Sequence, residues 1–456
     1  MGTSQSDPIS TGHSTLPIVL DRSSSTPLGS QVADRIRTLV TRGVLVRGDR
    51  LPSSRALAAE LGVARTVTEQ AFAQLVAEGW LEGRCGAGTF VAASGRVAAP
   101  RRTPPPRVDA SPLVRLDAGT PWIDPRHVAL WRRAWREVAA SEPPRGYDDA
   151  RGLPALRAAV AERLARTRGL EVDPDDVRIT AGTTDGLRHV LAALGPGAVG
   201  VEDPGYRAAV AVVRASGRRV RDLPALEPVR ELDGCAAAYV TPAHQHPLGP
   251  PMPGAHRLAL LEAARRADTL VVEDDYDSEL RYDVAPIPAL TTLDPARVAY
   301  LGTASKSVAP SLRLGWLVVP AGLQEPRDHH RARTHEVASW PVQRAMLVLL
   351  RDGYVDRVVR AARRVYAERA SRVAQALGPL VGPGSAAGMY VCVGLDEATA
   401  DAARAAAARA GLEIPPLSDY ARSRPRHGLV LGFGGCTDAQ LDAALEAIAS
   451  AVSAGS

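Results

Sequence analysis

The stretch VAYLGTASKSVAPSLRLGW, residues 298–316, decides how the rest of the chain is read. It predicts a buried strand at 298–301, followed by a loop of small and hydroxyl-bearing residues that contains Lys306. Of the 55 basic residues in the chain, 54 are arginine and Lys306 is the one lysine. A guanidinium stays charged, so it cannot replace an amine that must lose its proton and attack a carbonyl. Lys306 is therefore predicted to form a Schiff base.

The residues near Lys306 are also suited to bind a phosphate. Serine and threonine hydroxyls flank the lysine in residues 302–307, and Arg313 follows seven positions later. An arginine can hold a phosphate through two parallel hydrogen bonds. These features predict a cofactor with both a carbonyl and a phosphate. The alternative is that Lys306 is a chance survivor in an arginine-biased chain.

Two further predicted strands end in polar residues that fit the same chemistry. The strand at 177–180 leads through AGTTDG, residues 181–186, into a helix, so N–H groups and hydroxyls face an anion at a helix N-terminus. The apolar strand at 269–273 ends in Asp274-Asp275, at the strand end where open α/β sheets bind ligands. Alone, each pattern also fits an ordinary crossover or a solvated loop.

Length and composition predict several domains of globular type. The 456 residues are too many for one core, and 45% are hydrophobic and 23% charged. No apolar run approaches a membrane span, and the N-terminus has no signal pattern. The expected parts are a disordered N-terminus (1–16), a compact unit (17–94), a Pro/Arg-rich linker (95–115) and a large α/β unit (116–456) whose smaller C-terminal α+β subdomain begins near 330.

The four cysteines are scattered and form no CxxC pair. This pattern argues against a zinc site or a disulfide framework and favours a reducing, cytoplasmic location, with no metal and no membrane partner. The net charge of +5 is compatible with nucleic acid but does not discriminate.

Residues 17–94 have the helix, helix-turn-helix, hairpin order of a winged helix. Apolar residues at helical spacing predict helices over 32–40 and 63–76, and a capping signal at 51–54 precedes a second helix that carries Leu57, Ala58 and Leu61. Strands at 81–84 and 88–91 flank a Gly-rich turn. The polar start of the third helix would enter the major groove of DNA. Other side chains, including those of the wing, would bind the DNA phosphates. The predicted DNA contacts are Arg50, Ser53, Arg55, Arg65, Thr66, Thr68, Arg84, Gly86 and Thr89. The alternative is that these are solvated surface residues.

The segment PSSRALAAELGVARTVTEQAFAQLVAEGWLEGRCGAGTFVA, residues 52–92, resembles the winged helix of GntR-type bacterial repressors. The resemblance implies sequence-specific binding of double-stranded operator DNA by a dimer, with base contacts chiefly from Arg65 to Thr68. Residues 66–68 depart from the Arg-Asn-Thr run often seen there, so the operator sequence does not carry over.

Residues 116–456 resemble a fold-type I aminotransferase domain. The segments that carry the resemblance are RGLPALRAAVAERLARTRG after Tyr147, AGTTDGL, VEDPGY, TPAHQHPLG, VVEDDYDSELRY and GTASKSVAPSLRLGW. With its GntR-like head, the whole chain resembles the MocR/GabR-type transcription regulators. This implies an α/β fold with a largely parallel central sheet, and pyridoxal 5'-phosphate (PLP) as cofactor.

The resemblance also implies residue roles. Lys306 would form the Schiff base with PLP, Asp274 would pair with the pyridinium nitrogen, Tyr276 would reach the phenolate oxygen and Tyr206 would stack on the ring. A homodimer, head-to-tail with shared sites, is implied because Tyr147 resembles a tyrosine that reaches the neighbouring subunit's phosphate. The expected phosphate ligands are Thr183, Thr184, Thr303, Ser305 and Arg313.

The sequence departs from the aminotransferase pattern at three places. His246 stands where an Asn usually contacts the ring oxygen, and Tyr147 is followed by Asp148 rather than Gly. The segment at 427–433 lacks the Arg that often binds the substrate α-carboxylate. Candidates to replace it are Arg424, Arg426 and Arg207.

Three functions remain open at this point. The favoured one is a regulator whose PLP at Lys306 reacts with an amino compound and thereby changes the affinity of a dimer for DNA. The second is a working aminotransferase with an accessory DNA-binding domain. The third is a sensor of PLP itself, in which the loaded and empty forms differ in DNA binding.

Overall fold

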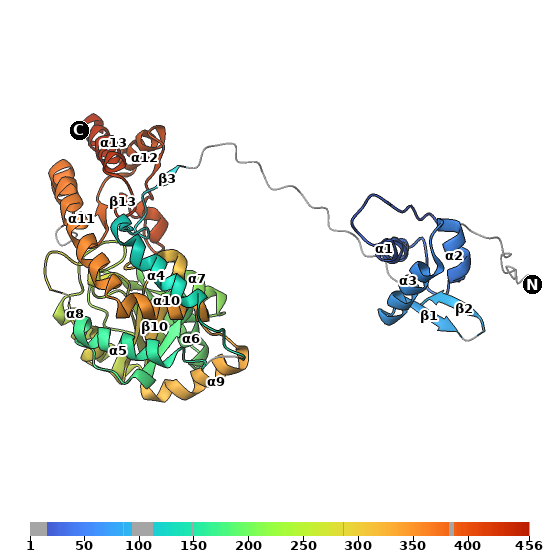
Figure 1. The fold of residues 1–456 in the computed structure, drawn as a ribbon. Helices are drawn as coiled ribbons and strands as arrows, with labels where there is room; N and C mark the ends of the chain where they lie inside the picture. Colours follow the sequence, from blue (N-terminus) through green and yellow to red (C-terminus); the bar gives the residue numbers. More distant parts are fainter. Residues whose placement is uncertain are drawn as a thin grey trace, which may run out of the picture. The chain divides into compact units, whose positions relative to one another are not determined.

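The computed structural model describes residues 16–84, 86–93, 113–146, 149–285, 287–382 and 387–455. The chain divides into two compact units, Met1–Asp109 and Ala110–Ser456, and each is described by itself (Figure 1). Tyr147, predicted to reach a partner's phosphate, lies outside the described residues, as do nearly all of the predicted disordered N-terminus and most of the predicted linker.

The N-terminal unit has the expected winged-helix order. Its elements are α1 (Leu28–Thr41), α2 (Ser54–Leu61), α3 (Arg65–Ala77), β1 (Leu81–Arg84) and β2 (Gly88–Val91). The Oγ of Ser53 accepts a hydrogen bond from the N–H of Ala56 at 3.1 Å and so caps α2. Gly62 ends α2 with a φ of 61°, a conformation that glycine adopts at little cost. These two residues fix the turn that aims α3.

Thr68, which the sequence predicted to contact DNA, is instead packed between α2 and α3. Its side chain is fully buried. Its hydroxyl donates to the carbonyl of Ser54 at 2.8 Å and also lies 2.9 Å from the carbonyl of Arg65. The buried face of α3 runs through Thr68, Ala71, Phe72 and Leu75, whereas Val76, the last apolar residue of the predicted helix at 63–76, is 44% exposed. The helix is therefore rotated relative to the apolar pattern, and Thr68 holds α3 against α2.

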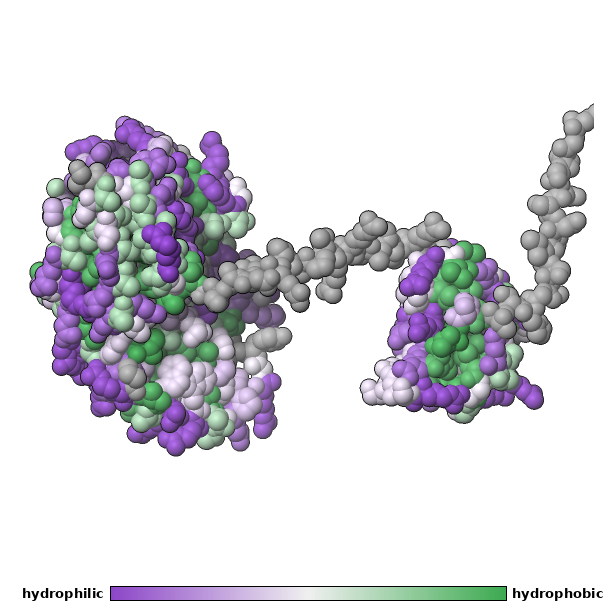
Figure 2. Space-filling view, turned by 90° about the horizontal axis from the view of Figure 1, so that it is seen from above, coloured by the Kyte–Doolittle hydropathy of each residue, from purple (hydrophilic) through white to green (hydrophobic). Residues whose placement is uncertain are grey.

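Figure 2 shows a concentrated apolar area on the N-terminal unit, framed by hydrophilic residues. Val19, Val44 and Val46 of this unit are 76%, 58% and 52% exposed. A small domain buries a smaller fraction of its surface than a large one, so exposed apolar side chains are common there.

The C-terminal unit is built on a seven-stranded sheet of order β4-β10-β9-β8-β7-β5-β6. β10 runs antiparallel to both of its neighbours, and strands β5 to β9 pair in parallel, which confirms the largely parallel sheet. The strands are β4 (Val177–Thr180), β5 (Ala198–Asp203), β6 (Val220–Pro224), β7 (Cys235–Val240), β8 (Leu270–Asp275), β9 (Val298–Thr303) and β10 (Gly315–Val318).

Helices cover both faces of this sheet. Ala237 and Tyr239 of β7 pack with α6 and α7, and Ala238 and Val240 pack with α8 on the other face. This alternation follows from the two-residue period of a strand. The helices are α4 (Val128–Ala139), α5 (Pro154–Arg168), α6 (Thr183–Ala193), α7 (Arg207–Ala215), α8 (Gly254–Arg266), α9 (Gln324–Thr334) and α10 (Trp340–Arg351).

The smaller subdomain includes a strand that the sequence analysis had placed in the linker. β3 pairs in parallel with β12, and in Figure 1 it lies beside the C-terminal elements. The predicted linker boundary at 115 is therefore too late, because a two-residue strand has no detectable periodicity. The elements are β3 (Val114–Arg115), α11 (Tyr354–Leu377), β11 (Tyr390–Val393), α12 (Glu397–Arg409), β12 (Leu412–Glu413), β13 (Leu429–Gly432) and α13 (Asp438–Gly455).

Among the described residues, no helix is long and apolar enough to cross a membrane. The same residues contain no group of three or more His, Cys, Asp or Glu side chains placed to hold a metal ion.

Thr68→Val should lower the free energy of unfolding of the isolated N-terminal unit by about 1 kcal/mol, because it removes a buried hydrogen bond. Thr66→Val is the matched control: Thr66 is exposed on the same helix, and its replacement should change stability by less than about 0.5 kcal/mol. Urea unfolding of a fragment spanning residues 16–93 measures both. A Thr68→Val variant of unchanged stability that loses operator preference would return Thr68 to the DNA contacts.

Candidate functional site

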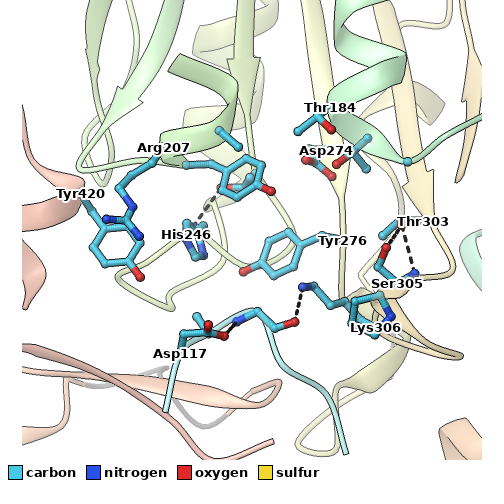
Figure 3. A pocket seen from close by; sticks show the side chains of 18 of the residues that line it. Asp117, Thr184, Arg207, His246, Asp274, Tyr276, Thr303, Ser305, Lys306 and Tyr420 are labelled. Atoms are coloured by element: carbon cyan, nitrogen blue, oxygen red, sulfur yellow. Dashed lines mark hydrogen bonds between the residues drawn. The ribbon is translucent and has the colours of Figure 1, made fainter. Parts of the chain in front are cut away.

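The ten described residues predicted to bind the cofactor all line one cavity of about 350 Å³ in the C-terminal unit. The cavity lies at the carboxyl ends of the parallel strands, where polar side chains follow β5, β8 and β9. In Figure 3, Lys306, Thr303 and Ser305 lie at one end of the cavity and Arg207 and Tyr420 at the other, with His246 and Tyr276 between them.

Lys306 presents its amine to this cavity. Its Nζ donates to the carbonyl of Gly119 at 2.6 Å. Burial lowers the pKa of the amine below its ordinary value, although the charges of Asp277, Asp117 and Asp274 oppose that shift. A lowered pKa increases the fraction of neutral amine, which is the form that attacks a carbonyl.

Asp274 faces the cavity, whereas Asp275 does not. Asp275 forms an ion pair with Arg168 at 2.6 Å and accepts from the Tyr300 hydroxyl at 2.5 Å on the opposite face of β8. Asp274 accepts a hydrogen bond from the Tyr239 hydroxyl through Oδ2, while its buried Oδ1 has no hydrogen-bond partner. Burial raises the pKa of Asp274 to about 7. Because Asp274 faces the cavity, this unpaired oxygen is free to accept a hydrogen bond from a bound group.

The predicted phosphate ligands form the anion-binding end of the cavity. Gly182 has a φ of 104° and directs the chain into α6, whose first two residues are Thr183 and Thr184. Nη2 of Arg313 lies 3.4 Å from Oγ1 of Thr184. At the end of β9, the hydroxyl of Thr303 donates to that of Ser305 at 2.9 Å. Hydroxyls, a helix N-terminus and a guanidinium together suit a phosphate dianion.

Aromatic rings line the cavity between this anion-binding end and the end that contains Arg207 and Tyr420. The Tyr276 hydroxyl donates to the carbonyl of His244 at 3.0 Å and lies 2.7 Å from the Tyr390 hydroxyl. Burial lowers the pKa of His246 to about 3, so its imidazole is neutral and keeps one N–H donor. The His246 and Tyr206 rings meet edge to face at 5.5 Å between centroids.

These residues fit PLP. The buried and unpaired Oδ1 of Asp274 suits a protonated ring nitrogen, and the amine of Lys306 suits the aldehyde. The hydroxyls and Arg313 suit the phosphate.

Several cavity residues were not anticipated from the sequence. Arg115 lay in the predicted linker, and Tyr239 and Thr241 lie at the end of a buried strand. Asp117 lies in a loop and Tyr420 ends the single-turn helix Leu417–Tyr420, both without a motif. The pairing of β3 with β12 is what brings Arg115 to the cavity. Of the three candidate carboxylate ligands, Arg207 lines the cavity, whereas Arg424 and Arg426 are exposed and do not.

The remaining predicted DNA contacts lie on the N-terminal unit. Arg65 is 63% exposed at the start of α3 and pairs with Glu69 at 2.7 Å. Arg84 pairs with Glu82 and lies 4.6 Å over the Phe90 ring, which orients it in the wing. The hydroxyl of Ser53 is already used in capping α2. Arg50, Arg55, Thr66 and Gly86 are exposed and Thr89 is half-buried.

Each of the two units matches a known protein family. Residues 28–91 match the family of bacterial regulatory proteins, gntR family, and residues 111–448 match aminotransferase class I and II. The chain is 34% identical to the HTH-type pyridoxine biosynthesis transcriptional regulator PdxR of Corynebacterium glutamicum, over 96% of this chain and 99% of that protein. It is 33% identical to the probable rhizopine catabolism regulatory protein MocR of Rhizobium meliloti, over 92% of each chain.

The chain belongs to the MocR/PdxR-type transcription regulators. Its C-terminal unit has the aminotransferase fold: a crystal structure of an archaeal alanine:glyoxylate aminotransferase superposes with a TM-score of 0.66 at 24% identity, covering 75% of this chain and 90% of that one. The aminotransferase class I and II fold typically binds PLP. The sequence-based family and fold predictions are thereby confirmed.

In this regulator without cofactor, stability should fall as the pH rises from about 4 to 7, in part because of Asp274. Its folded-state pKa of about 7 lies above the ordinary 3.8, so folding favours the protonated form, and that contribution is lost as the pH rises through 7. Between these pH values, Asp274→Asn should reduce the fall in the free energy of unfolding by up to about 4 kcal/mol. This figure follows from the pKa difference, at about 1.4 kcal/mol per pKa unit.

Urea unfolding at several pH values measures the effect. Glu202, whose pKa burial also raises to about 7, supplies a second variant, Glu202→Gln, which should flatten the profile further when it is combined with the first. A pH profile that Asp274→Asn leaves unchanged would place the titration on another group.

Proposed function

We propose that this protein is a PLP-dependent, DNA-binding regulator in which the aminotransferase-like domain responds to an amino compound through the cofactor held at Lys306. The observation that carries the proposal is that Lys306 and the unpaired Oδ1 of Asp274 share one cavity in a chain that also has a winged helix. When bound, PLP supplies an aldehyde that condenses with amines and a ring that withdraws electrons.

The chain's own residues would position and tune that cofactor. Asp274 would keep a proton on the ring nitrogen, because its partner Tyr239 leaves Oδ1 free to accept. Arg313 and the four hydroxyl residues would hold the phosphate. Neutral His246 would donate to the ring oxygen in place of the usual Asn. Tyr276 lies within reach of the same cavity.

The partners follow from the two halves of the chain. We infer double-stranded operator DNA at the winged helix, a small amino compound as effector, and a cytoplasmic homodimer with shared sites. An effector can change DNA affinity only if it binds two states of the protein with different affinity.

A second candidate is a sensor of PLP itself. The 34% identity with a pyridoxine biosynthesis regulator over nearly the full length favours it. In this version the loaded and empty forms differ in operator affinity, and no amine is needed.

Lys306→Ala should abolish the visible absorption band that the PLP-loaded protein is expected to have, and with it the response of operator binding to amines. Lys306→Arg is the matched control, since it keeps the positive charge but cannot form an imine. Borohydride reduction followed by mass spectrometry should locate the cofactor on Lys306, the one lysine of the chain.

Operator affinity and release of 2-oxo acid, measured on the same protein, separate the candidates. We expect at least one amine to change operator affinity while turnover stays far below about 10 s⁻¹, a typical kcat. PLP alone changing the affinity would select the second candidate. Turnover near that rate, with an operator affinity that neither amines nor PLP change, would make the protein an aminotransferase.

Arg65→Ala should weaken operator binding by about 1–3 kcal/mol and blur sequence preference, because Arg65 lies at the start of the recognition helix. Arg84→Ala, in the wing, should weaken binding more evenly across sequences. Titration of the full chain with operator and with scrambled DNA measures both. Intact operator affinity in Arg65→Ala would show that another element reads the bases.

A further inference from the structure

A buried cluster of side chains joins the smaller subdomain to the wall of the cofactor cavity. Tyr390 begins β11 of that subdomain, is fully buried and is not among the residues that line the cavity. Its hydroxyl lies 2.7 Å from the hydroxyl of Tyr276, which follows β8 and does line the cavity. Tyr390 therefore contacts a predicted cofactor ligand from outside the cavity.

A hydrogen-bonded pair, His244 and Asp277, supports the two tyrosines. Nδ1 of His244 lies 2.7 Å from Oδ2 of Asp277, and the two side chains are 1% and 2% exposed. The His244 ring stacks on the rings of Tyr390 and Tyr276, with centroids 4.9 and 5.9 Å apart. A carboxylate only accepts hydrogen bonds, so Nδ1 carries a proton and donates it to Asp277. The pair thus fixes the orientation of the imidazole against both phenol rings.

Gly388 allows the smaller subdomain to come this close. Its φ is 78°, and a Cβ added there would lie 2.6 Å from Oδ2 of Asp277 and 2.8 Å from Cε1 of His244. Any side chain at this position would push the start of β11 away from the pair. The close approach is what brings Tyr390, two residues later, onto the His244 ring.

The hydrogen bonds around the Tyr276 hydroxyl leave one consistent arrangement of protons. Burial raises the pKa of both tyrosines, so each hydroxyl keeps one proton to donate. Tyr276 donates to the carbonyl of His244 at 3.0 Å, because Nδ1 of that residue, 3.2 Å away, is committed to Asp277. Tyr390 then donates to Tyr276, since its alternative acceptor, the carbonyl of Gln245, is 3.4 Å away.

We infer that Tyr390 is a positioning residue for the cofactor and acts through Tyr276. It holds the Tyr276 hydroxyl at the cavity wall and, by donating to it, directs the Tyr276 proton to an acceptor other than Tyr390. The inference rests on the proposed function, since it concerns PLP held at Lys306, and it adds a residue of the smaller subdomain to that site. No covalent step is involved.

Two acceptors compete for the Tyr276 proton when PLP is bound. One is the neutral carbonyl of His244, which accepts it in the structure. The other is the oxygen on the PLP ring, which carries negative charge, and hydrogen bonds to charged acceptors are about twice as strong as those to neutral ones. A hydroxyl that already accepts a hydrogen bond is also a better donor, by about 10–30%. Tyr390 should therefore strengthen the bond from Tyr276 to the ring oxygen.

The same contact links the cofactor to the placement of the smaller subdomain. β11 pairs with β13 of that subdomain, whereas Tyr276 directly follows β8 of the large sheet. A displacement of the smaller subdomain would withdraw the Tyr390 hydroxyl, and Tyr276 would lose its donor. The protonation of bound PLP, which is visible in its absorbance, should then change. The absorbance of the cofactor thus reports on the position of the smaller subdomain.

The test is a double-mutant cycle on the PLP-loaded full-length protein, read by the pH at which the visible cofactor band changes. The ring oxygen carries more negative charge in the high-pH form, so a donor to it favours that form. Tyr276→Phe removes this donor and should move the transition to higher pH by about one unit. Tyr390→Phe should move it in the same direction by about 0.3 units. Adding Tyr390→Phe to Tyr276→Phe should cause no further shift.

The affinity for PLP gives a second cycle on the same four proteins. At a pH above the transition, the bond to the ring oxygen contributes to binding. The Kd of PLP should therefore rise about tenfold in Tyr276→Phe and about twofold in Tyr390→Phe. The double variant should bind PLP no more weakly than Tyr276→Phe alone.

Tyr366→Phe is the matched control. The hydroxyl of Tyr366, fully buried on α11 of the smaller subdomain, accepts from the N–H of Trp122 at 2.9 Å, and neither residue lines the cavity. Its removal should lower the free energy of unfolding without moving the transition of the cofactor band. A shift as large as that of Tyr390→Phe would show that any loosening of this subdomain has the same effect, and would overturn the inference.

Two further results would overturn the inference while leaving the proposed function standing. One is a cofactor band and a PLP affinity that Tyr390→Phe leaves unchanged. The other is an effect of Tyr390→Phe that is undiminished in the Tyr276→Phe background, which would show that Tyr390 reaches the cofactor by another route. A protein that forms no cofactor band when PLP is added would contradict the proposed function itself, and the inference with it.

Discussion

The site depends on one buried carboxylate. Asp274 is held in the centre of a sheet with one oxygen satisfied by Tyr239 and the other left without a partner. A buried, unpaired acceptor is costly in a folded protein, and that cost is relieved when a cationic donor enters the cavity. Burial also raises the pKa of this carboxyl to about 7. The fold therefore keeps a buried acceptor open to the same cavity that the amine of Lys306 and the neighbouring hydroxyls line.

The sheet makes this arrangement possible by separating neighbouring residues onto different faces. Asp274 faces the cavity, while Asp275, one residue further, is neutralised by Arg168 on the opposite side. Two adjacent acids thus serve unrelated purposes, one structural and one facing a ligand. A shift of one residue in the register of β8 would exchange them, so the packing of that strand between two helical layers is also what specifies the site.

Sequence reasoning succeeded where a residue's chemistry was unusual and failed where its role depends on distant contacts. Lys306 was identifiable because no other lysine is present, and the winged helix was recognisable from its motif. The burial of Thr68 was not foreseen, since a polar residue on a recognition helix is indistinguishable in sequence from one that bonds a neighbouring helix. Arg115 was missed because only the pairing of β3 with β12, almost 300 positions apart, brings it to the cavity. Tertiary contacts of this kind leave no local pattern.

A cofactor site of this type becomes regulatory only if its occupancy changes something outside the cavity. The walls built from β8 and β9 are part of a packed sheet and cannot move much without loss of the core. The wall built from Tyr420 and Arg207 is different, because it is closed by a solvated ion pair between two subdomains. Beside it, the N–H of Arg422 donates to Asp203 and its side chain donates to Asp222, so the neighbouring segment is held by hydrogen bonds as well. An outer wall of this kind is the part of the cavity that can rearrange while the sheet beneath it stays packed.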